Sequence, residues 1–500
     1  MKKYIVDYVQ TWAEQAPSHT ALIFQGTSIT YGELFARVEK TASGLIHRGA
    51  KPGDYVAYMM PPCPQFYYLY LAASIVGCPC VGLNVRSKPA EIIAFLKKKQ
   101  PKLFVVDNTL INGLPNDLAG VTDVLCPNDL ISPITPSVRA AIDHYRSGIN
   151  PDSIVFEICS SGTSGQASCA LLTQENILTA CLAQLREFGA PYGYQPDDLV
   201  QQVFPVNHVS GAVEFGVAPL LCGSALSVHP LFSPQRIMDD IQHNAVTMMV
   251  GVPAMWEAIL RHPSFQQCDF SRIRWCGVGA APVRDEILQR MLDIGGVISN
   301  PLGMTELSGF CSAFGGITDW TLLRDSVGKI IPELEWKIVD DNYCPVCRGE
   351  IGQLAYRGAS VISSYADRPL KKTADGFFLS GDLAFYDNNG YIHLRGRIDD
   401  QFQVGGYNVV PIEIENEILS YPGILQTAVV PVPHRTMGSV CHAYVVPKRG
   451  CQIDSKKLID WLDDRLIYYK VPRSIHVCES LPTNELGKVL HKSLIAHPIL

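Results

Sequence analysis

Short segments that combine glycine with hydroxyl-bearing or charged residues occur at several points, each near the end of an expected strand. The first is Ser160–Gly165, which follows a strand expected over 154–158. Small hydroxylated residues between glycines let the backbone approach an anion, and their N–H and O–H groups can surround a phosphate. The segment is not a Walker A loop, because no Gly-Lys-Ser/Thr follows at the required spacing. A flexible surface loop remains the alternative interpretation.

Later segments carry further polar groups, and ligand sites in α/β folds gather beyond strand ends. Their notable residues are His208; Gly303, Thr305 and Glu306; Asp382; Arg397; and Lys488. A threonine hydroxyl can donate to a phosphate oxygen, and a neighbouring carboxylate can hold Mg²⁺. A carboxylate after a glycine turn, as at Asp382, can accept hydrogen bonds from two ribose hydroxyls. Taken singly, His208 is better explained as a loop histidine and Lys488 as solvated surface charge.

The elements that must position these residues alternate between strand and helix patterns. Over residues 1–107 this alternation predicts a mostly parallel sheet covered on both faces, and further βα units follow to about residue 293. The apolar window 66–85 contains Gly77 and Pro79 and predicts a buried helix followed by a buried strand, not a membrane span. An amphipathic helix is expected over 88–99, with its lysines at the exposed end.

The pattern changes twice more along the chain. Residues 108–150 have weak periodicity and are expected to form surface connections. From about 320 to 397, short strands and turn signals predict a β-rich subdomain, with a hairpin turn at Asp387–Gly390. A polar segment at 396–400 is a candidate hinge. We therefore predict an α/β fold with a large domain over 1–397 and a small α+β domain over 398–500.

Composition restricts the function classes. The 500 residues are 47% hydrophobic and 18% charged with a net charge of −7, which predicts a globular protein without an overall basic surface for nucleic acid. Sixteen cysteines without a disulfide framework predict reduced thiols and a cytoplasmic protein. The lone pair Cys344 and Cys347 has no second CxxC, so we interpret both as structural residues.

Order and spacing together make a more specific pattern than any one segment. The chain resembles the adenylate-forming superfamily of acyl-CoA synthetases, adenylation domains and luciferases over nearly its whole length. The resemblance rests on Ser160–Gly165, Gly303–Glu306, Gly381-Asp382, Gly396–Asp399, Gly405–Tyr407, Pro411–Glu415, and Pro482 with Gly487-Lys488. It implies a large N-terminal domain with a mobile C-terminal lid. It also implies that ATP converts a carboxylate into an acyl-adenylate, from which coenzyme A then displaces AMP.

The resemblance assigns nucleotide-binding roles to matching positions. The residues that would hold the β- and γ-phosphates are Ser161, Gly162, Thr163, Ser164 and Gly165. Thr305, next to Gly303, would contact the α-phosphate, and Glu306 would hold Mg²⁺. Asp382 would bind the ribose hydroxyls with Arg397 nearby. Lys488 would stabilise charge on the α-phosphate and the acyl oxygen during adenylation.

Other matches concern the lid and the acyl group. Asp399 would be the hinge residue on which the lid turns, and Gly405 and Gly406 would line the thiol tunnel. His208 matches a gate residue between the acyl and nucleotide pockets. The acyl pocket would include Val209, Gly279, Ala280 and Ala281. Val209 stands where amino-acid-activating members carry an aspartate, which argues against an α-amino acid substrate. Glu214 could face a polar group of the substrate, or it could be structural.

The chain also departs from the superfamily pattern. Ala167-Ser168-Cys169 stands where Pro-Lys-Gly is usual, so a loop lysine is missing, and Leu302 and Gln174 replace a usual tyrosine and histidine. We predict an ATP-dependent carboxylic acid–CoA ligase that requires Mg²⁺ and acts on a small-molecule acid. One alternative is an acyl-AMP ligase that delivers to an acyl carrier protein or an amine. The other is a catalytically attenuated acyl- or nucleotide-binding protein.

Overall fold

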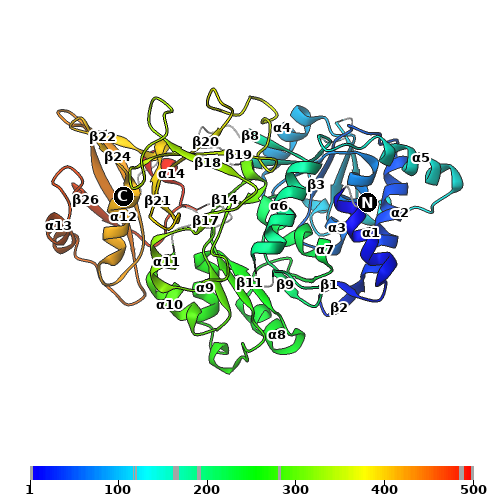
Figure 1. Cartoon of the computed structure of the whole chain (residues 1–500), viewed down its shortest axis with the longest axis horizontal. Helices are drawn as coiled ribbons and strands as arrows, with labels where there is room; N and C mark the ends of the chain where they lie inside the picture. The colour runs from blue at the N-terminus through cyan, green and yellow to red at the C-terminus, as the bar shows by residue number, and fades with distance from the viewer. Residues whose placement is uncertain are drawn as a thin grey trace.

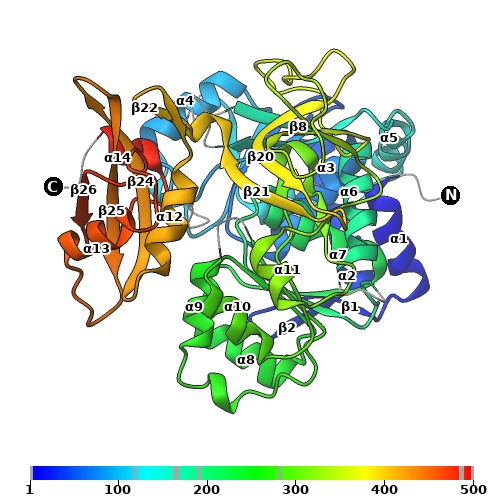
Figure 2. The same ribbon diagram turned by 60° about the vertical axis from the view of Figure 1, so that its left-hand side comes forward.

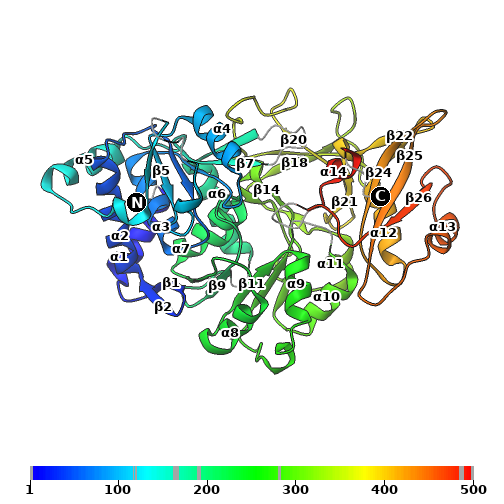
Figure 3. The same ribbon diagram turned by 180° about the vertical axis from the view of Figure 1, so that it is seen from behind.

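The computed structural model describes residues 4–115, 118, 121–160, 168–188, 193–279, 283–483 and 489–496. Its larger part is layered, with helices α3, α6 and α7 between two mostly parallel sheets (Figure 1). These helices span Pro64–Val76, Gln174–Glu187 and Ala218–Cys222. The smaller part, made of the last hundred or so residues, lies at the opposite end from the N-terminal helices (Figures 1 and 3).

One of the two sheets has the order β6-β5-β3-β4-β7-β8 and is parallel except at the β7–β8 edge. Its strands are β3 (Val56–Met59), β4 (Cys80–Gly82), β5 (Leu103–Val106), β6 (Asp123–Leu125), β7 (Ile154–Ser160) and β8 (Ser168–Thr173). The strands of its centre are almost wholly apolar, as expected for a parallel sheet that is covered on both faces.

The other sheet has the order β13-β12-β11-β9-β10-β1-β2 and is parallel except at the β1–β2 hairpin. Its strands are β1 (Thr20–Phe24), β2 (Thr27–Thr30), β9 (Leu199–Gln202), β10 (Ala225–Val228), β11 (Met248–Gly251), β12 (Trp275–Val278) and β13 (Val297–Ser299). The β1–β2 hairpin therefore pairs with β10, which lies some 200 residues later in the chain, and Leu22 is opposite Leu226. The sequence predicts one mostly parallel sheet over residues 1–107, whereas the structure places β1 and β2 in a different sheet from β3, β4 and β5.

The helices outside the central layer cover the outer faces and ends of these sheets (Figures 1 and 2). They are α1 (Ile5–Gln15), α2 (Tyr31–His47), α4 (Pro89–Lys99), α5 (Pro136–Ser147), α8 (Pro234–Asn244), α9 (Pro253–Leu260), α10 (Asp285–Leu292) and α11 (Trp320–Asp325). Helix α2 begins with a capping box, in which Thr30 and Glu33 bond to each other's backbone N–H groups. The expectation of surface connections throughout 108–150 is wrong for α5, whose buried Val138 and Ile142 repeat at helical spacing.

Beyond residue 300 the chain forms shorter antiparallel structures. The pairs β14 (Gly303–Met304) with β15 (Gly309–Phe310) and β16 (Ser312–Ala313) with β17 (Lys329–Ile330) come first. A sheet of β18 (Glu335–Val339), β19 (Gly352–Arg357), β20 (Phe378–Tyr386) and β21 (Ile392–Arg397) follows. The predicted β-rich segment and its hairpin at Asp387–Gly390 are confirmed by β20 and β21, which pair antiparallel.

The C-terminal region has its own sheet and core. The sheet runs β23-β22-β25-β24 with β26 beside β25, and α12, α13 and α14 pack against it. These elements are β22 (Phe402–Val404), β23 (Tyr407–Val409), α12 (Pro411–Ser420), β24 (Ile424–His434), β25 (Gly438–Pro447), α13 (Ser455–Asp463), β26 (Ser474–Val477) and α14 (His491–Ala496). Its buried side chains form clusters separate from the main core, which extends to Ile392. The domain boundary between 397 and 398 stays a prediction.

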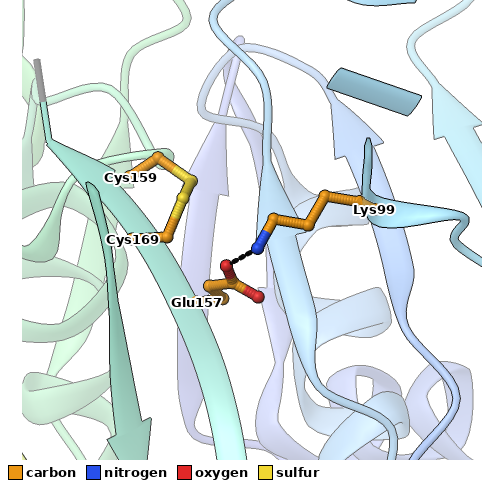
Figure 4. Close-up of a disulfide and its surroundings, with 4 residues drawn as sticks. All are labelled: Lys99, Glu157, Cys159 and Cys169. Atoms are coloured by element: carbon orange, nitrogen blue, oxygen red, sulfur yellow. Dashed lines mark hydrogen bonds and ion pairs between the residues drawn. A yellow bond between two sulfur atoms is a disulfide. The ribbon is translucent and has the colours of Figure 1, made fainter. Parts of the chain in front are cut away.

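A disulfide joins two adjacent strands at the edge of the six-stranded sheet. Cys159 on β7 and Cys169 on β8 are directly opposite each other and are bonded (Figure 4). The expectation that all the cysteines are reduced thiols is wrong for this pair, because sheet pairing brings together residues whose spacing carries no disulfide signal. The two bonded residues flank the glycine- and serine-rich segment. The cytoplasmic location stays a prediction.

The same edge contains a buried ion pair. Lys99, at the end of α4, pairs with Glu157 on β7, whose side chain is fully buried (Figure 4). The expectation that the lysines of this helix all lie at an exposed end is therefore wrong for Lys99. Burial lowers the pKa of Lys99.

A search of the described part of the chain finds no helix with the length and apolarity needed to cross a bilayer.

The disulfide predicts a definite thiol count. Two of the sixteen cysteines are bonded, so the non-reduced, denatured protein should contain fourteen reactive thiols and the reduced protein sixteen. Titration with a thiol reagent in denaturant measures both values. The double variant Cys159→Ser/Cys169→Ser is the control, and it should give fourteen with and without reductant. A count of sixteen before reduction would contradict the bond.

Candidate active site

A cleft of about 1190 Å³ runs between the seven-stranded sheet, the β18–β21 sheet and the C-terminal region. Several residues that the sequence singles out line it: Val209, Gly279, Gly303, Thr305, Glu306, Asp382 and Arg397. They come from segments up to about 190 residues apart. The structure thus brings Val209 and Gly279 of the expected acyl pocket into one cavity with those expected nucleotide-binding residues that it describes.

Thr305 and Glu306 lie on a short 3₁₀ turn, η6 (Thr305–Leu307), between the paired strands β14 and β15. The tight pairing of Gly303 with Phe310 fixes this turn, because a Cβ on Gly303 would lie 3.0 Å from the Phe310 Cα. Tyr365 donates its hydroxyl to Glu306 Oε1 at 2.5 Å. Burial, and next the Glu306 charge, raise the pKa of Tyr365, so the phenol stays a donor. The Glu306 carboxylate is thereby held in one orientation facing the cleft.

Asp382 and Arg397 face each other across strands β20 and β21. Arg397 Nη1 donates to Asp382 Oδ1 at 2.7 Å, and its Nη2 donates to the Ser380 carbonyl oxygen at 3.2 Å. The intervening Gly381 has φ +81°, and a Cβ there would lie 2.9 Å from Arg397 Nη2. Glycine is therefore required for the turn that lets the guanidinium reach both oxygens. The pair presents a carboxylate and a cation together at the cleft.

Aromatic rings form the wall of the cleft near Val209. Five of its lining residues are Phe188, Phe204, Phe215, Trp275 and Phe310. Phe188 stacks on Trp275 with 4.5 Å between ring centroids and contacts Phe310 at 4.4 Å. Sequence reasoning missed this set, because its members come from separate elements and show no shared spacing. Gly279 lies at its edge, whereas Ala280 and Ala281 lie outside the described residues.

Glu214 is a carboxylic acid within this aromatic wall. It lies on η4, a π-helix over Ser210–Val217, and only 8% of its surface is exposed. The Ser210 side chain and the Phe310 backbone N–H hydrogen-bond to its carboxylate. Burial nevertheless raises the pKa of Glu214 from 4.5 to about 7. The sequence left open whether Glu214 faces the acyl pocket, and the structure places it in the lining of the cleft.

The expected phosphate-binding residues Ser161, Gly162, Thr163, Ser164 and Gly165 lie outside the described residues, but the strands on both sides are described. Ser160 ends β7 opposite Ser168, which begins β8. Arg368 Nε donates to Ser168 Oγ at 3.2 Å, and its guanidinium lies 4.4 Å from the centroid of the Tyr365 ring. Ser168 occupies the position of the missing loop lysine, so a cation from a distant loop lies against it. Sequence reasoning missed Arg368, because its pairing with Ser168 depends on the bridge between Ala170 and Tyr365.

Lys488 also lies outside the described residues. On either side of its segment, Thr483 pairs with Val489, and both Val489 and His491 line the cleft. Lys448 in the C-terminal region also forms an ion pair with Glu286 of α10 at 2.6 Å. The C-terminal region therefore closes one side of the cavity in this structure.

Four expected residues lie outside the cleft lining. His208 directly precedes Val209 and is half-buried at the start of the π-helical segment. Asp399 is exposed on the 3₁₀ turn η7 (Ile398–Asp400), which directly follows β21. Gly405 and Gly406 form the turn between β22 and β23, with φ values of +58° and +87°. All four lie in turns or next to the start of a helical segment, where the backbone changes direction.

Sequence comparisons agree with this arrangement. The sequence profile described as AMP-binding enzyme matches residues 9–366, and that of the AMP-binding enzyme C-terminal domain matches residues 413–488. The chain belongs to the AMP-binding enzyme family. This AMP-binding enzyme is 31% identical to a feruloyl-CoA synthase of Amycolatopsis over 487 residues, which is 96% of both chains. It is 27% identical to 4-coumarate–CoA ligase 1 of Solanum tuberosum over 93% of this chain and 88% of that protein.

Solved structures of similar fold confirm the predicted α/β architecture with a small C-terminal domain. ATP-bound MatB from Rhodopseudomonas palustris is 26% identical, with a TM-score of 0.85 over 98% of both chains. The apo form of MatB, with the same coverage, gives a TM-score of 0.75. Since the sequence compared is the same, the difference reflects conformation, and this AMP-binding enzyme is closer to the ATP-bound arrangement.

The buried Glu214 predicts a pH-dependent effect on stability. Its folded pKa of about 7 exceeds the ordinary value of 4.5, so the folded state binds more protons between these values. Stability from the neutral carboxyl is complete below about pH 4.5 and is lost as the pH rises through about 7, a change on the order of 3 kcal/mol. Glu214→Gln stays neutral, so its stability relative to wild type should rise by that amount between pH 4.5 and pH 8.

Guanidinium unfolding of both proteins across this range measures the difference. Glu335→Gln makes the same substitution at an exposed carboxylate on β18 and should show little such trend. The other titratable groups that interact electrostatically with Glu214 are Cys181, Tyr194 and Cys311, and burial raises the pKa of each. They therefore stay neutral between pH 4.5 and 8. A pH-independent difference would mean that Glu214 keeps an ordinary pKa.

Proposed function

We propose that this protein uses ATP to activate an aromatic carboxylic acid and then transfers the acyl group to coenzyme A. The protein is an AMP-forming acid–thiol ligase, and the sequence-based prediction of this activity is confirmed by the family and by the acid–CoA ligases among its relatives. The observation that carries the choice of acid is the cleft, in which an aromatic wall lies beside Thr305, Glu306 and Asp382. Flat rings pack well against aromatic side chains.

In the first half-reaction, a substrate carboxylate oxygen attacks the α-phosphorus of ATP, and the bond from that phosphorus to the pyrophosphate oxygen breaks. The Thr305 hydroxyl donates to an α-phosphate oxygen, and the Asp382 carboxylate accepts from the ribose hydroxyls. Arg397 fixes Asp382 through the 2.7 Å bond and adds positive charge nearby. This reaction depends on positioning and on compensating phosphate charge.

Glu306 fits a Mg²⁺ site. Its carboxylate is oriented by the Tyr365 hydroxyl and stands beside the Thr305 hydroxyl, and Mg²⁺ prefers such oxygen ligands. When bound with ATP, Mg²⁺ would neutralise charge on the phosphate oxygens. The side chains themselves hold the nucleotide in line with the acid.

In the second half-reaction, the thiolate of coenzyme A attacks the acyl carbonyl carbon, and AMP leaves. We infer that the C-terminal region turns about Asp399 between the two steps, so that Lys488 serves adenylation and Gly405 and Gly406 then line the thiol path. His208 gates the passage between acyl and nucleotide pockets. The higher TM-score with ATP-bound than with apo MatB supports the present arrangement as the one for adenylation.

Arg368 compensates in part for the missing loop lysine. Pyrophosphate departure requires positive charge near the β- and γ-phosphates, which Ser161–Gly165 would hold. Arg368 bonds to Ser168 at the end of that segment and can supply this charge. The departure at Ser168 is thus balanced from another part of the fold, which favours an active enzyme over an attenuated binding protein.

Partial reactions test the proposed function. With Mg²⁺ and ATP, the wild-type protein should exchange pyrophosphate into ATP in the presence of aromatic acids, and coenzyme A should then cause AMP release. Lys488→Ala should lose nearly all exchange, because the charge on the α-phosphate loses its cation. Surface variant Lys456→Ala on α13 is the control and should behave as wild type. Exchange without coenzyme A-dependent release would favour delivery to a carrier protein or an amine, and absence of exchange with every acid would contradict the proposal.

Arg368 and Ser168 allow a complementary test. Arg368→Ala should reduce the rate of exchange at least tenfold, because a charge-assisted contact contributes on the order of 1.5–3 kcal/mol. Adding Ser168→Lys to that variant should restore much of the rate, since it returns a cation to the loop. Exchange kinetics at saturating acid measure both effects. An unchanged rate in Arg368→Ala would show that Arg368 serves structure alone.

A further inference from the structure

Glu214 has no task in the two half-reactions described above, although it is the buried carboxyl group of the aromatic wall. Polar groups in such surroundings are costly to bury unless they are hydrogen-bonded. Among the described residues, no lysine, arginine or histidine forms an ion pair with Glu214. The groups shown to interact with it electrostatically include the neutral Cys181, Tyr194 and Cys311. Within the described part of the chain, its carboxyl group thus has no ion-pair partner.

The surrounding backbone is arranged to make room for this side chain. Gly309 has φ +142°, and a Cβ there would lie 3.0 Å from Glu214 Cγ and 3.3 Å from its Oε1. Gln184 Nε2 donates to the Glu214 carbonyl oxygen at 2.6 Å and so fixes the segment from behind. The π-helical turn that carries Glu214 is a local irregularity of a kind that often occurs at functional sites. These contacts hold the carboxyl group at one place in the wall.

The carboxyl group keeps hydrogen-bonding capacity toward the cleft. Its two oxygens offer about four acceptor positions when the group is ionised and fewer when it is protonated. The bonds from Ser210 and from the Phe310 N–H use two of them. Glu214 lines the cleft together with Phe188, Phe215 and Trp275. A substrate ring packed on these aromatic side chains would bring its substituents within reach of a fixed acceptor.

We propose that Glu214 determines acid specificity by accepting a hydrogen bond from a donor group on the aromatic ring of the substrate. This inference rests on the proposed function and names the substrate class more narrowly: aromatic acids with a ring hydroxyl or amino group. The distance from the adenylation site to Glu214 determines which ring position of the substrate must carry the donor group. An acid that lacks the donor leaves the carboxyl group facing an apolar ring, which disfavours binding.

Matched acids provide the test. Benzoic and cinnamic acids are compared with their hydroxyl, amino and methoxy derivatives at each ring position, with kcat/KM for pyrophosphate exchange as the measurement. The methoxy group fills space but donates no hydrogen bond. Wild type should favour at least one acid with a ring hydroxyl or ring amino group over its methoxy and unsubstituted counterparts by tenfold or more. The hydroxyl and amino series show which donor fits better.

Two variants separate specificity from folding. Glu214→Leu should lose the preference for ring donors and retain or gain activity with unsubstituted acids, whereas Glu214→Gln keeps an acceptor oxygen and should retain part of the preference. Glu335→Gln should keep the wild-type preference. Thermal unfolding shows whether Glu214→Leu folds. If it does not, Glu214→Gln and Ser210→Ala replace it in the comparison. Ser210→Ala removes one hydrogen bond to the Glu214 carboxyl group.

The outcomes distinguish this inference from the proposed function. If wild type activates aromatic acids but favours no ring donor, or if Glu214→Leu keeps the wild-type preference, Glu214 is a structural tether between η4 and β15 and the inference fails alone. If wild type activates aliphatic acids and no aromatic acid, both the proposed class of acid and the inference about Glu214 fail. Exchange with no acid contradicts the ligase function itself.

Discussion

The bond between Arg397 and Asp382 is the contact on which the arrangement of the cleft most depends. It joins β20 to Arg397, which is the last residue of β21 and the last one before the predicted domain boundary. Arg397 also bonds to the Ser380 carbonyl oxygen, so the guanidinium fixes the turn at Gly381. Because Arg397 precedes Asp399, the same residue fixes the carboxylate of the proposed nucleotide site and the fixed end of the proposed hinge. A change in the position of one therefore affects the other.

The site is built from pairwise supports rather than from one continuous motif. Tyr365 orients Glu306, and three residues later in the same loop Arg368 reaches Ser168 and packs on the Tyr365 ring. One loop therefore supports both the proposed metal ligand and the strand that follows the phosphate segment. The disulfide between Cys159 and Cys169 ties the two strands of that segment together. The usual lysine is absent, but charge and rigidity reach the same place from elsewhere in the fold.

The acyl side of the cleft combines low polarity with one carboxyl group. Phe188, which directly follows α6, and rings from η4, β12 and β15 line the cleft together with Glu214, only 8% of whose surface is exposed. Burial is the reason that its pKa rises, and two hydrogen bonds limit that rise. The same burial makes a hydrogen bond from a substrate worth more than it would be in water. Burial of Glu214 thus costs stability when the carboxyl group is charged, and the same burial strengthens the hydrogen bond proposed to determine specificity.

The sequence by itself determined the family and the fold class, and it singled out Thr305, Glu306, Asp382 and Arg397, which the structure places in one cleft, because glycine turns and polar strand ends are local in the chain. It also determined the hairpin before β21. The tertiary structure alone decided the contacts of Tyr365, Arg368 and Lys99, the placement of β1 beside β10, the Cys159–Cys169 bond and the aromatic wall around Glu214. Each of these depends on strand pairing or on packing between distant segments, whose geometry leaves no periodic or spaced signal in the sequence.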